Sequence, residues 1–329
     1  MINQPWWIDL LKAALIINLV MGLFAYMTWV ERKVLGRMQL RYGPNRAGPF
    51  GLLQPIADLV KLIRKESFFP MTAVDLLYIG APALSAFTAL AAFSVIPWGP
   101  GWHVGRYDVT GQVANVPISL ILVFALGSLG IYGFIVGGWA SDSKYSLLGS
   151  MRTCAQMVSY EVALTFAVLG VVILGHSLSL VDLVHQQAVQ LPFAAPQLIG
   201  LLIFFIAGIA ETNRAPFDLP EAETELVAGY HTEYSGMRFG LFQMGEYVNM
   251  ITLSAVLVTL FLAGWHGPYR PLGPVWFALK LLAVIFVFMW MRATLPRLRY
   301  DQLMRFGWKV LLPVATLNAL VTALVVAAT

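Results

Sequence analysis

Long apolar segments alternate with short polar segments along almost the whole chain. Eight apolar segments are long enough to cross a bilayer as helices. They are centred on residues 13–30, 76–96, 117–136, 156–174, 193–210, 239–263, 275–291 and 310–328. Segments such as 198–210 are continuously apolar, whereas strands of an outer-membrane barrel would alternate in polarity. The pattern therefore predicts an all-α polytopic membrane protein with eight transmembrane helices, forming a single integral membrane domain over residues 1–329.

The first and longest loop contains a different hydrophobic pattern. Residues 51–66 read GLLQPIADLVKLIRKE, and their apolar side chains recur at helical spacing on one side. Gln54, Asp58, Lys61 and Lys65 line the opposite side. Pro55 is compatible with a helix because it falls in the first turn. The segment predicts an amphipathic helix that lies in the membrane interface on the cytoplasmic side.

Composition and charge agree with a membrane protein. Apolar residues make up 59% of the chain, charged residues 12%, and the mean hydropathy is +0.74. The odd-numbered loops hold 17 of the 21 Lys and Arg residues, which predicts that these loops are cytoplasmic and both termini lie on the outer face of the cell (inner) membrane. The net charge of +4 is then a consequence of topology, so nucleic acid is not an expected partner. The five bases of residues 292–309 are expected to lie at the surface, near lipid headgroups.

The N-terminal residues and the few possible metal ligands argue against a cleaved signal peptide and against a metal or cofactor site on this chain. Trp6, Trp7 and Asp9 precede the first apolar run, which is typical of a first helix and not of a cleaved signal. Cys154 is the only cysteine, so the chain has too few thiols for a four-cysteine iron–sulfur cluster. The five histidines do not pair at metal-ligand spacing, and we find no nucleotide-binding loop. We expect no metal and no cofactor bound by this chain.

Three acidic residues are expected within or beside the apolar helices. Arg152 is taken to mark the cytoplasmic end of the fourth helix, so Glu161 would lie roughly 14 Å further along it. Glu246 would lie roughly 12 Å beyond Arg238, at the start of the sixth helix. Glu211 is expected near the inner end of the fifth helix.

These carboxylates permit two interpretations. In the first they form a proton relay, because burial and mutual repulsion favour the protonated form of each acid. In the second each acid is a structural group held by a tyrosine or a backbone carbonyl. Carboxylates inside a membrane are expensive and are mostly functional, which favours the relay.

The polar segment at about residues 211–238 is unusually acidic for a loop on the basic side of the membrane. Its carboxylates beyond Glu211 are Asp218, Glu221, Glu223, Glu225 and Glu233. Pro216 and Pro220 disfavour a helix that starts before them. From composition alone the loop could be a solvated surface, neutralised by the bases of neighbouring loops, as readily as a functional site.

Four long motifs identify a family. They read WVERKVLGRMQLRYGPNRAGPFGLLQPIADLVKLIRKE from residue 29, GWASDSKYSLLGSMRTCAQMVSYE from residue 138, ETNRAPFDLPEAETELVAGYHTEY from residue 211 and RATLPRLRYDQLMRFGWK from residue 292. The chain closely resembles the family of the membrane-embedded H subunit of NADH-quinone oxidoreductase, respiratory complex I. The likeness extends from the first predicted helix to the last.

The resemblance implies a subunit of a proton-translocating enzyme complex that uses NADH and a quinone. By this likeness the chain docks a hydrophilic arm whose subunits hold FMN and iron–sulfur clusters, contacts other membrane subunits and lipids, and walls a quinone tunnel. The tunnel residues implied are Arg32, Arg41, Arg46, Asp58 and Asp218. The acids implied for the proton route are Glu161, Glu211, Glu221, Glu223, Glu225 and Glu246. No catalytic residue is expected on this chain itself.

Two alternatives remain open. The chain could be the membrane anchor subunit of a membrane-bound hydrogenase or a ferredoxin-linked complex, which needs no quinone tunnel. A stand-alone secondary transporter would show repeated halves and broken midplane helices, and neither is visible. The sequence does not distinguish ubiquinone from menaquinone.

Overall fold

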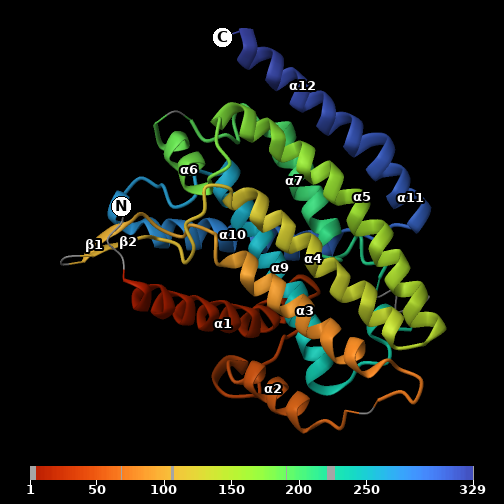
Figure 1. The fold of residues 1–329 in the computed structure, drawn as a ribbon. Helices are drawn as coiled ribbons and strands as arrows, with labels where there is room; N and C mark the ends of the chain where they lie inside the picture. The colour runs from red at the N-terminus through yellow and green to blue at the C-terminus, as the bar shows by residue number, and fades with distance from the viewer. Residues whose placement is uncertain (1–4, 68, 105–106, 190, 221–226, 329) are drawn as a thin grey trace.

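The computed structural model is a bundle of long helices (Figure 1) and describes residues 5–67, 69–104, 107–189, 191–220 and 227–328. Each of the eight predicted transmembrane segments corresponds to helix. These are α1 (Trp6–Met38), α3 (Asp75–Phe93), α4 (Ser119–Ala140), α5 (Lys144–Gly175), α7 (Leu198–Glu211), α9 (Gly236–Phe261), α10 (Gly273–Thr294) and α12 (Leu312–Ala328) with the segments before it. The all-α polytopic class is confirmed.

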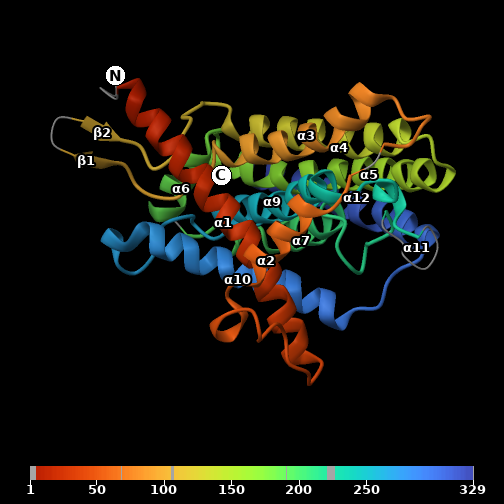
Figure 2. The same cartoon turned by 90° about the horizontal axis from the view of Figure 1, so that it is seen from below.

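Helix α9 is the centre of the bundle, and α1 lies at its edge. In the most apolar stretch of α9, 94% of the residues are buried, against 17% in α1. Helices α3, α7 and α10 all pack against α9, and α5 joins α4, α7 and α12 on the far side. Figure 2 shows α1 crossing the bundle obliquely, with its last turns projecting beyond the other helices.

Glycines of α4 allow its neighbours to approach closely. A Cβ at Gly133 would lie 2.9 Å from the carbonyl oxygen of Ala81 in α3, and a Cβ at Gly138 would lie 2.4 Å from the Cβ of Ser150 in α5. Small residues at such positions are how helices in a membrane gain dispersion contacts. The close packing that the glycine-rich sequence of α4 favours is therefore present on both sides of this helix.

The substitution Gly138→Ala is expected to destabilise the protein by about 1–3 kcal/mol, because the added methyl group overlaps Ser150 and the carbonyl oxygen of Ser146. The measurement is the midpoint of thermal unfolding in detergent. Gly22→Ala is the matched control, since a Cβ there meets nothing within 4 Å. Equal midpoints for the two variants would contradict the close packing of α4 on α5.

Several element boundaries differ from those predicted. Helix α5 begins at Lys144, two turns before Arg152, so the assignment of Arg152 to the end of this helix was wrong. The last helix begins earlier too, because α11 (Tyr300–Phe306) and a π-helical segment (Gly307–Leu311) run directly into α12. Gly307 lies at this π segment, where a Cβ would be 3.3 Å from the ring of Tyr160.

Helix α7 is shorter than a membrane span. Its 14 residues extend roughly 21 Å, less than the roughly 30 Å of a hydrocarbon core. Smaller elements also lie between the long helices and were not predicted. These are a hairpin of β1 (Trp102–Val104) and β2 (Tyr107–Val109), α6 (Leu180–Val189), and short 3-10 turns at Pro49–Gly51, Gly229–His231 and Arg270–Leu272.

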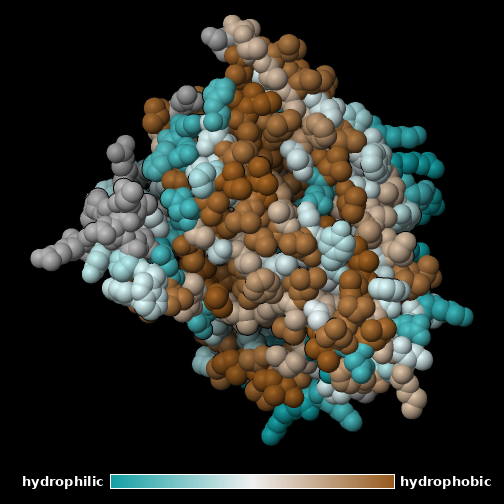
Figure 3. Space-filling model, in the orientation of Figure 1, coloured by the Kyte–Doolittle hydropathy of each residue, from teal (hydrophilic) through white to brown (hydrophobic). Residues whose placement is uncertain are grey.

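The predicted amphipathic helix is present as α2 (Gln54–Arg64). It packs against α1 and α9. Its outward apolar side chains, such as Ile56 and Ile63, are more than half exposed. The surface as a whole shows broad apolar areas over the helices, with hydrophilic side chains gathered at the edges (Figure 3). Both features fit a protein surrounded by lipid on its sides.

Candidate functional site: buried charges among the helices

Two of the predicted acids meet at a single point on α4. The hydroxyl of Ser128 donates a hydrogen bond to Oε1 of Glu161 in α5. At the adjacent residue, Gly127, a Cβ would lie 3.6 Å from Oε1 of Glu211 in α7. The two carboxylates are close enough to interact electrostatically. Both carboxylates therefore lie beside the same turn of α4.

Glu211 is almost completely enclosed. Its side chain is 5% exposed, and its Oε2 atom has no hydrogen-bond partner among the described residues. The end of α7 is held by Gln156 of α5, whose amide nitrogen donates to the carbonyl oxygens of Ala210 and Phe217 at 2.7 and 2.8 Å. A carboxylate in this position is costly to ionise without a partner. It can serve as a site that gains and loses a proton.

The third predicted acid, Glu246, lies at a separate point in α9. The hydroxyl of Tyr230 donates to its Oε1 at 2.6 Å, and both side chains are 5% exposed or less. Tyr230 is itself held by α5, since the hydroxyl of Ser146 donates to its carbonyl oxygen at 2.8 Å. The segment before α9 is anchored to α4 by Tyr234, whose hydroxyl donates to Gly137, and burial raises the pKa of that hydroxyl. The acidic segment at residues 211–238 thus contacts Glu246 directly through Tyr230.

Two of the predicted tunnel residues are in direct contact. Arg32 of α1 and Asp58 of α2 form an ion pair at 2.8 Å, which joins these two helices. Arg41 is exposed and donates to Gln39 at 2.7 Å, and Arg46 is exposed as well. Asp218 is partly buried in the segment that follows α7. The carboxylates predicted at Glu221, Glu223 and Glu225 lie outside the described residues.

A buried charge cluster that was not predicted lies where α1 meets α9 and α10. Glu31 of α1 is 4% exposed. Arg292 of α10 donates to Oε1 of Glu31, Tyr247 of α9 donates to Oε2 at 2.6 Å, and a guanidinium nitrogen of Arg214 lies 3.7 Å from Oε1. The guanidinium of Arg214 also stacks 4.0 Å from the ring centre of Tyr247. Arg292, which was expected at the surface, is partly exposed, and its guanidinium pairs with this buried acid.

One signal for this cluster was present in the sequence. The buried residues Ile16, Val20 and Met27 of α1 form a stripe at helical spacing, and Glu31 continues it one turn later. Lys12 lies on the same stripe and donates to Thr110 and to the carbonyl oxygen of Gln112. A charge on the buried face of a helix requires a partner from another helix. The stripe therefore predicts that Glu31 is paired, although it does not say with what.

The arrangement can hold and exchange protons and can bind a polar group. Within the described residues no three His, Cys, Asp or Glu side chains come together as a metal site requires. Glu246 lies in α9. The other carboxylates of this set, Glu31, Glu161 and Glu211, lie in α1, α5 and α7, and each of these helices packs against α9. The fold and these charges define a multi-pass helical membrane protein with ionisable groups buried between its helices.

Comparison with known proteins gives the family. The family model described as NADH dehydrogenase matches residues 11–323. The H subunit of NADH-quinone oxidoreductase from Syntrophotalea carbinolica is 52% identical over 313 residues, which cover 95% of this chain and 94% of that protein. The H subunit from Thermomicrobium roseum is 50% identical over 327 residues (97% and 96%), and an H subunit from Geobacter metallireducens is 52% identical over 315 residues (96% and 95%). The chain belongs to the family of NADH-quinone oxidoreductase H subunits.

Proposed function

We propose that the chain is a membrane subunit of a proton-translocating NADH-quinone oxidoreductase. In this proposal it walls the quinone tunnel and transmits quinone reduction to buried glutamates. The observation that carries the proposal is the set of buried or partly buried carboxylates on neighbouring helices, with Glu161, which is partly buried, and Glu211, which is buried, meeting at α4. Such groups inside a membrane protein mark proton routes more often than structural contacts.

The tunnel begins between α1, α2 and α9 in this proposal. Helix α2 packs against both other helices, and the Arg32–Asp58 pair joins it to α1. Arg41, Arg46 and Asp218 would add polar groups to the lining. The cluster of Glu31, Arg214 and Arg292 lies where α1 meets α9 and α10. Its guanidinium groups would donate a hydrogen bond to a quinone headgroup there.

Reduction of a quinone to a quinol takes up two electrons and two protons. The electrons would come from FMN and iron–sulfur clusters in partner subunits. The protons withdrawn change the charge around residues 211–238, including the proposed relay members Glu221, Glu223 and Glu225. Tyr230 carries that change to Glu246, since it contacts this acid and belongs to the same loop. Moving or neutralising a neighbouring charge shifts the protonation of a buried carboxylate, which passes the signal on to Glu161 and Glu211.

The polar loops rich in Lys and Arg are cytoplasmic in this proposal, and both termini face outward. The tunnel mouth at α2 then lies on the same side as the partner subunits of the hydrophilic arm.

The partner set tests this proposal against the hydrogenase-type anchor. We expect subunits that bind FMN and iron–sulfur clusters, together with antiporter-like membrane chains, to co-purify with this chain in a mild detergent, and the complex to reduce quinone with NADH. The measurement is mass spectrometry of the purified complex, followed by an NADH:quinone activity assay. Co-purification of a catalytic hydrogenase chain, with no quinone reduction by NADH, would contradict it.

A further inference from the structure

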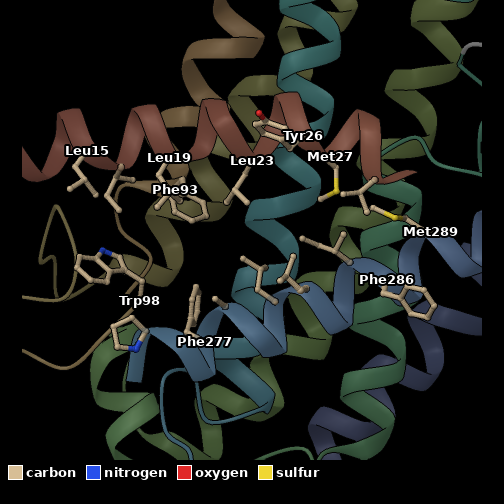
Figure 4. A pocket seen from close by; sticks show the side chains of 17 residues that line it. Leu15, Leu19, Leu23, Tyr26, Met27, Phe93, Trp98, Phe277, Phe286 and Met289 are labelled. Atoms are coloured by element: carbon tan, nitrogen blue, oxygen red, sulfur yellow. The ribbon is translucent and has the colours of Figure 1, made fainter. Parts of the chain in front are cut away.

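A long apolar groove runs between α1 and α10 on the outside of the bundle. Figure 4 shows side chains of α1, among them Leu15, Leu19 and Leu23, opposite Phe277 and Phe286 of α10. The groove encloses about 550 Å³. Leu19, Tyr26 and Phe286 are between 44% and 48% exposed, so the groove opens to the surroundings of the bundle.

At one end the groove continues into a second cavity of about 530 Å³ that contains basic side chains. Phe286 lines both cavities. The second cavity is lined by Trp29, Lys33 and Arg37 of α1. Within the described part of the chain, neither Lys33 nor Arg37 forms an ion pair with a carboxylate, and the Lys33 ammonium contacts only neutral groups, Asn45 and the ring of Trp29. Among the described residues, no carboxylate pairs with the positive charges at this end of the groove.

The stripe of α1 that lines both cavities changes character along its length. Leu15, Leu19, Leu23 and Tyr26 are followed by Trp29, and then by Lys33 and Arg37, at spacings of three or four residues, about one turn. From Leu15 to Val30 the helix rises roughly 22 Å, more than half of a hydrocarbon core of roughly 30 Å. Lys33 and Arg37 are separated by roughly 6 Å along the axis, so both side chains can reach one phosphate group. This order, an apolar run, then a Trp, then cations, follows the order of an acyl chain, a glycerol backbone and a phosphate.

We propose that the groove between α1 and α10 binds one anionic phospholipid, with an acyl chain between the two helices and the phosphate at Lys33 and Arg37. Basic pockets between transmembrane helices at the membrane face bind anionic headgroups. Two other occupants fit less well. A partner helix would favour small residues at the contact, whereas most of this lining is Leu, Phe, Tyr and Met. A quinone tail carries no charge that would require two cations.

The test is photolabelling of the whole purified complex in nanodiscs. One probe is phosphatidylglycerol with a diazirine in its acyl chain, and the other is phosphatidylcholine with the same chain. We expect the phosphatidylglycerol probe to label peptides of α1 and α10 that line the groove roughly tenfold more strongly than the phosphatidylcholine probe, because each cation contributes to binding the anionic headgroup. Mass spectrometry locates the adducts. No turnover is needed, so the result is independent of the proposed proton relay.

The variant Lys33→Gln/Arg37→Gln is expected to lower phosphatidylglycerol labelling to the level of phosphatidylcholine. The matched control is Arg305→Gln/Lys309→Gln, which removes two exposed cations from α11 and the π segment away from the groove and should leave labelling unchanged. If the variant complex fails to assemble, competition by unlabelled phosphatidylglycerol against unlabelled phosphatidylcholine on the native complex decides the same question. The proposal would be overturned if the two probes label the groove equally, or if neither probe labels it. It would also be overturned if phosphatidylglycerol labelling persists in the Lys33/Arg37 variant, or if the two unlabelled lipids compete equally.

Discussion

Replacing Glu161 or Glu246 by glutamine is expected to lower NADH:quinone activity and its proton pumping by roughly a hundredfold or more, since a positioned group that transfers protons typically contributes about 10²–10⁴-fold. Glutamine has the size of glutamate but cannot take up and release a proton. Glu161 would retain its contact with Ser128, and Glu246 its contact with Tyr230, through the amide oxygen. Packing is therefore preserved while the proposed chemistry is removed.

The controls separate the relay from damage to the complex. Oxidation of NADH by an artificial acceptor, which takes electrons before they reach quinone, should stay at the unmodified level in both variants. Glu66→Gln is the matched substitution, because Glu66 is an exposed glutamate just beyond α2. Unimpaired quinone reduction with full proton pumping in both the Glu161 and Glu246 variants would remove these two residues from the relay.

The variant Glu31→Gln is expected to impair both stability and quinone reduction. It removes the Glu31 carboxylate that the guanidinium groups of Arg292 and Arg214 approach at the contact of α1, α9 and α10. Removing one partner of a buried ion pair costs about 3–5 kcal/mol, since the remaining charge stays buried and uncompensated. Arg292 is partly exposed, so we expect the lower end of this range. The measurements are the thermal unfolding midpoint and the quinone reductase rate.

A double-mutant cycle isolates the contribution of the pair. Arg292→Gln alone should also destabilise the protein, and the double variant Glu31→Gln/Arg292→Gln should lose less than the sum of the two single losses. Simple additivity would show that the contact between Glu31 and Arg292 makes no net contribution to stability. A double variant that regains stability but not quinone reduction would assign the two charges to the tunnel and not only to the fold.

Hydropathy was enough to predict the class of protein and the positions of the helices. Each segment that crosses the membrane must be apolar and must form its backbone hydrogen bonds within itself, so its own residues reveal it. The eight predicted segments all became helix, and α2 formed within two or three residues of its predicted ends. Boundaries were less predictable. Lys144 begins α5 although it is charged, and the π segment starts at Gly307, which packs closely against the ring of Tyr160 in another helix.

The candidate site was partly predictable, because an acid within an apolar stretch of sequence stands out. Glu211 and Glu246 lie in apolar surroundings along the chain, and both are buried in the structure. Glu31 was missed because it stands beside charged residues that begin a polar loop, although it continues the buried stripe of α1. Arg292 looked like one of several surface bases for the same reason. The sequence around Glu31 and around Arg292 resembles that of an exposed charged residue. Only the contact between the two side chains in the structure reveals that they form an ion pair in which Glu31 is buried.

The sequence by itself determined a polytopic helical protein with acids among its helices, because the cost of placing each group in hydrocarbon is a property of its own segment. Which charges meet was decided only by the tertiary structure. Glu31 and Arg292 are separated by 261 positions, and they pair because α1 and α10 pack beside α9. The groove that leads to Lys33 and Arg37 arises from the same packing, since its two walls come from opposite ends of the chain.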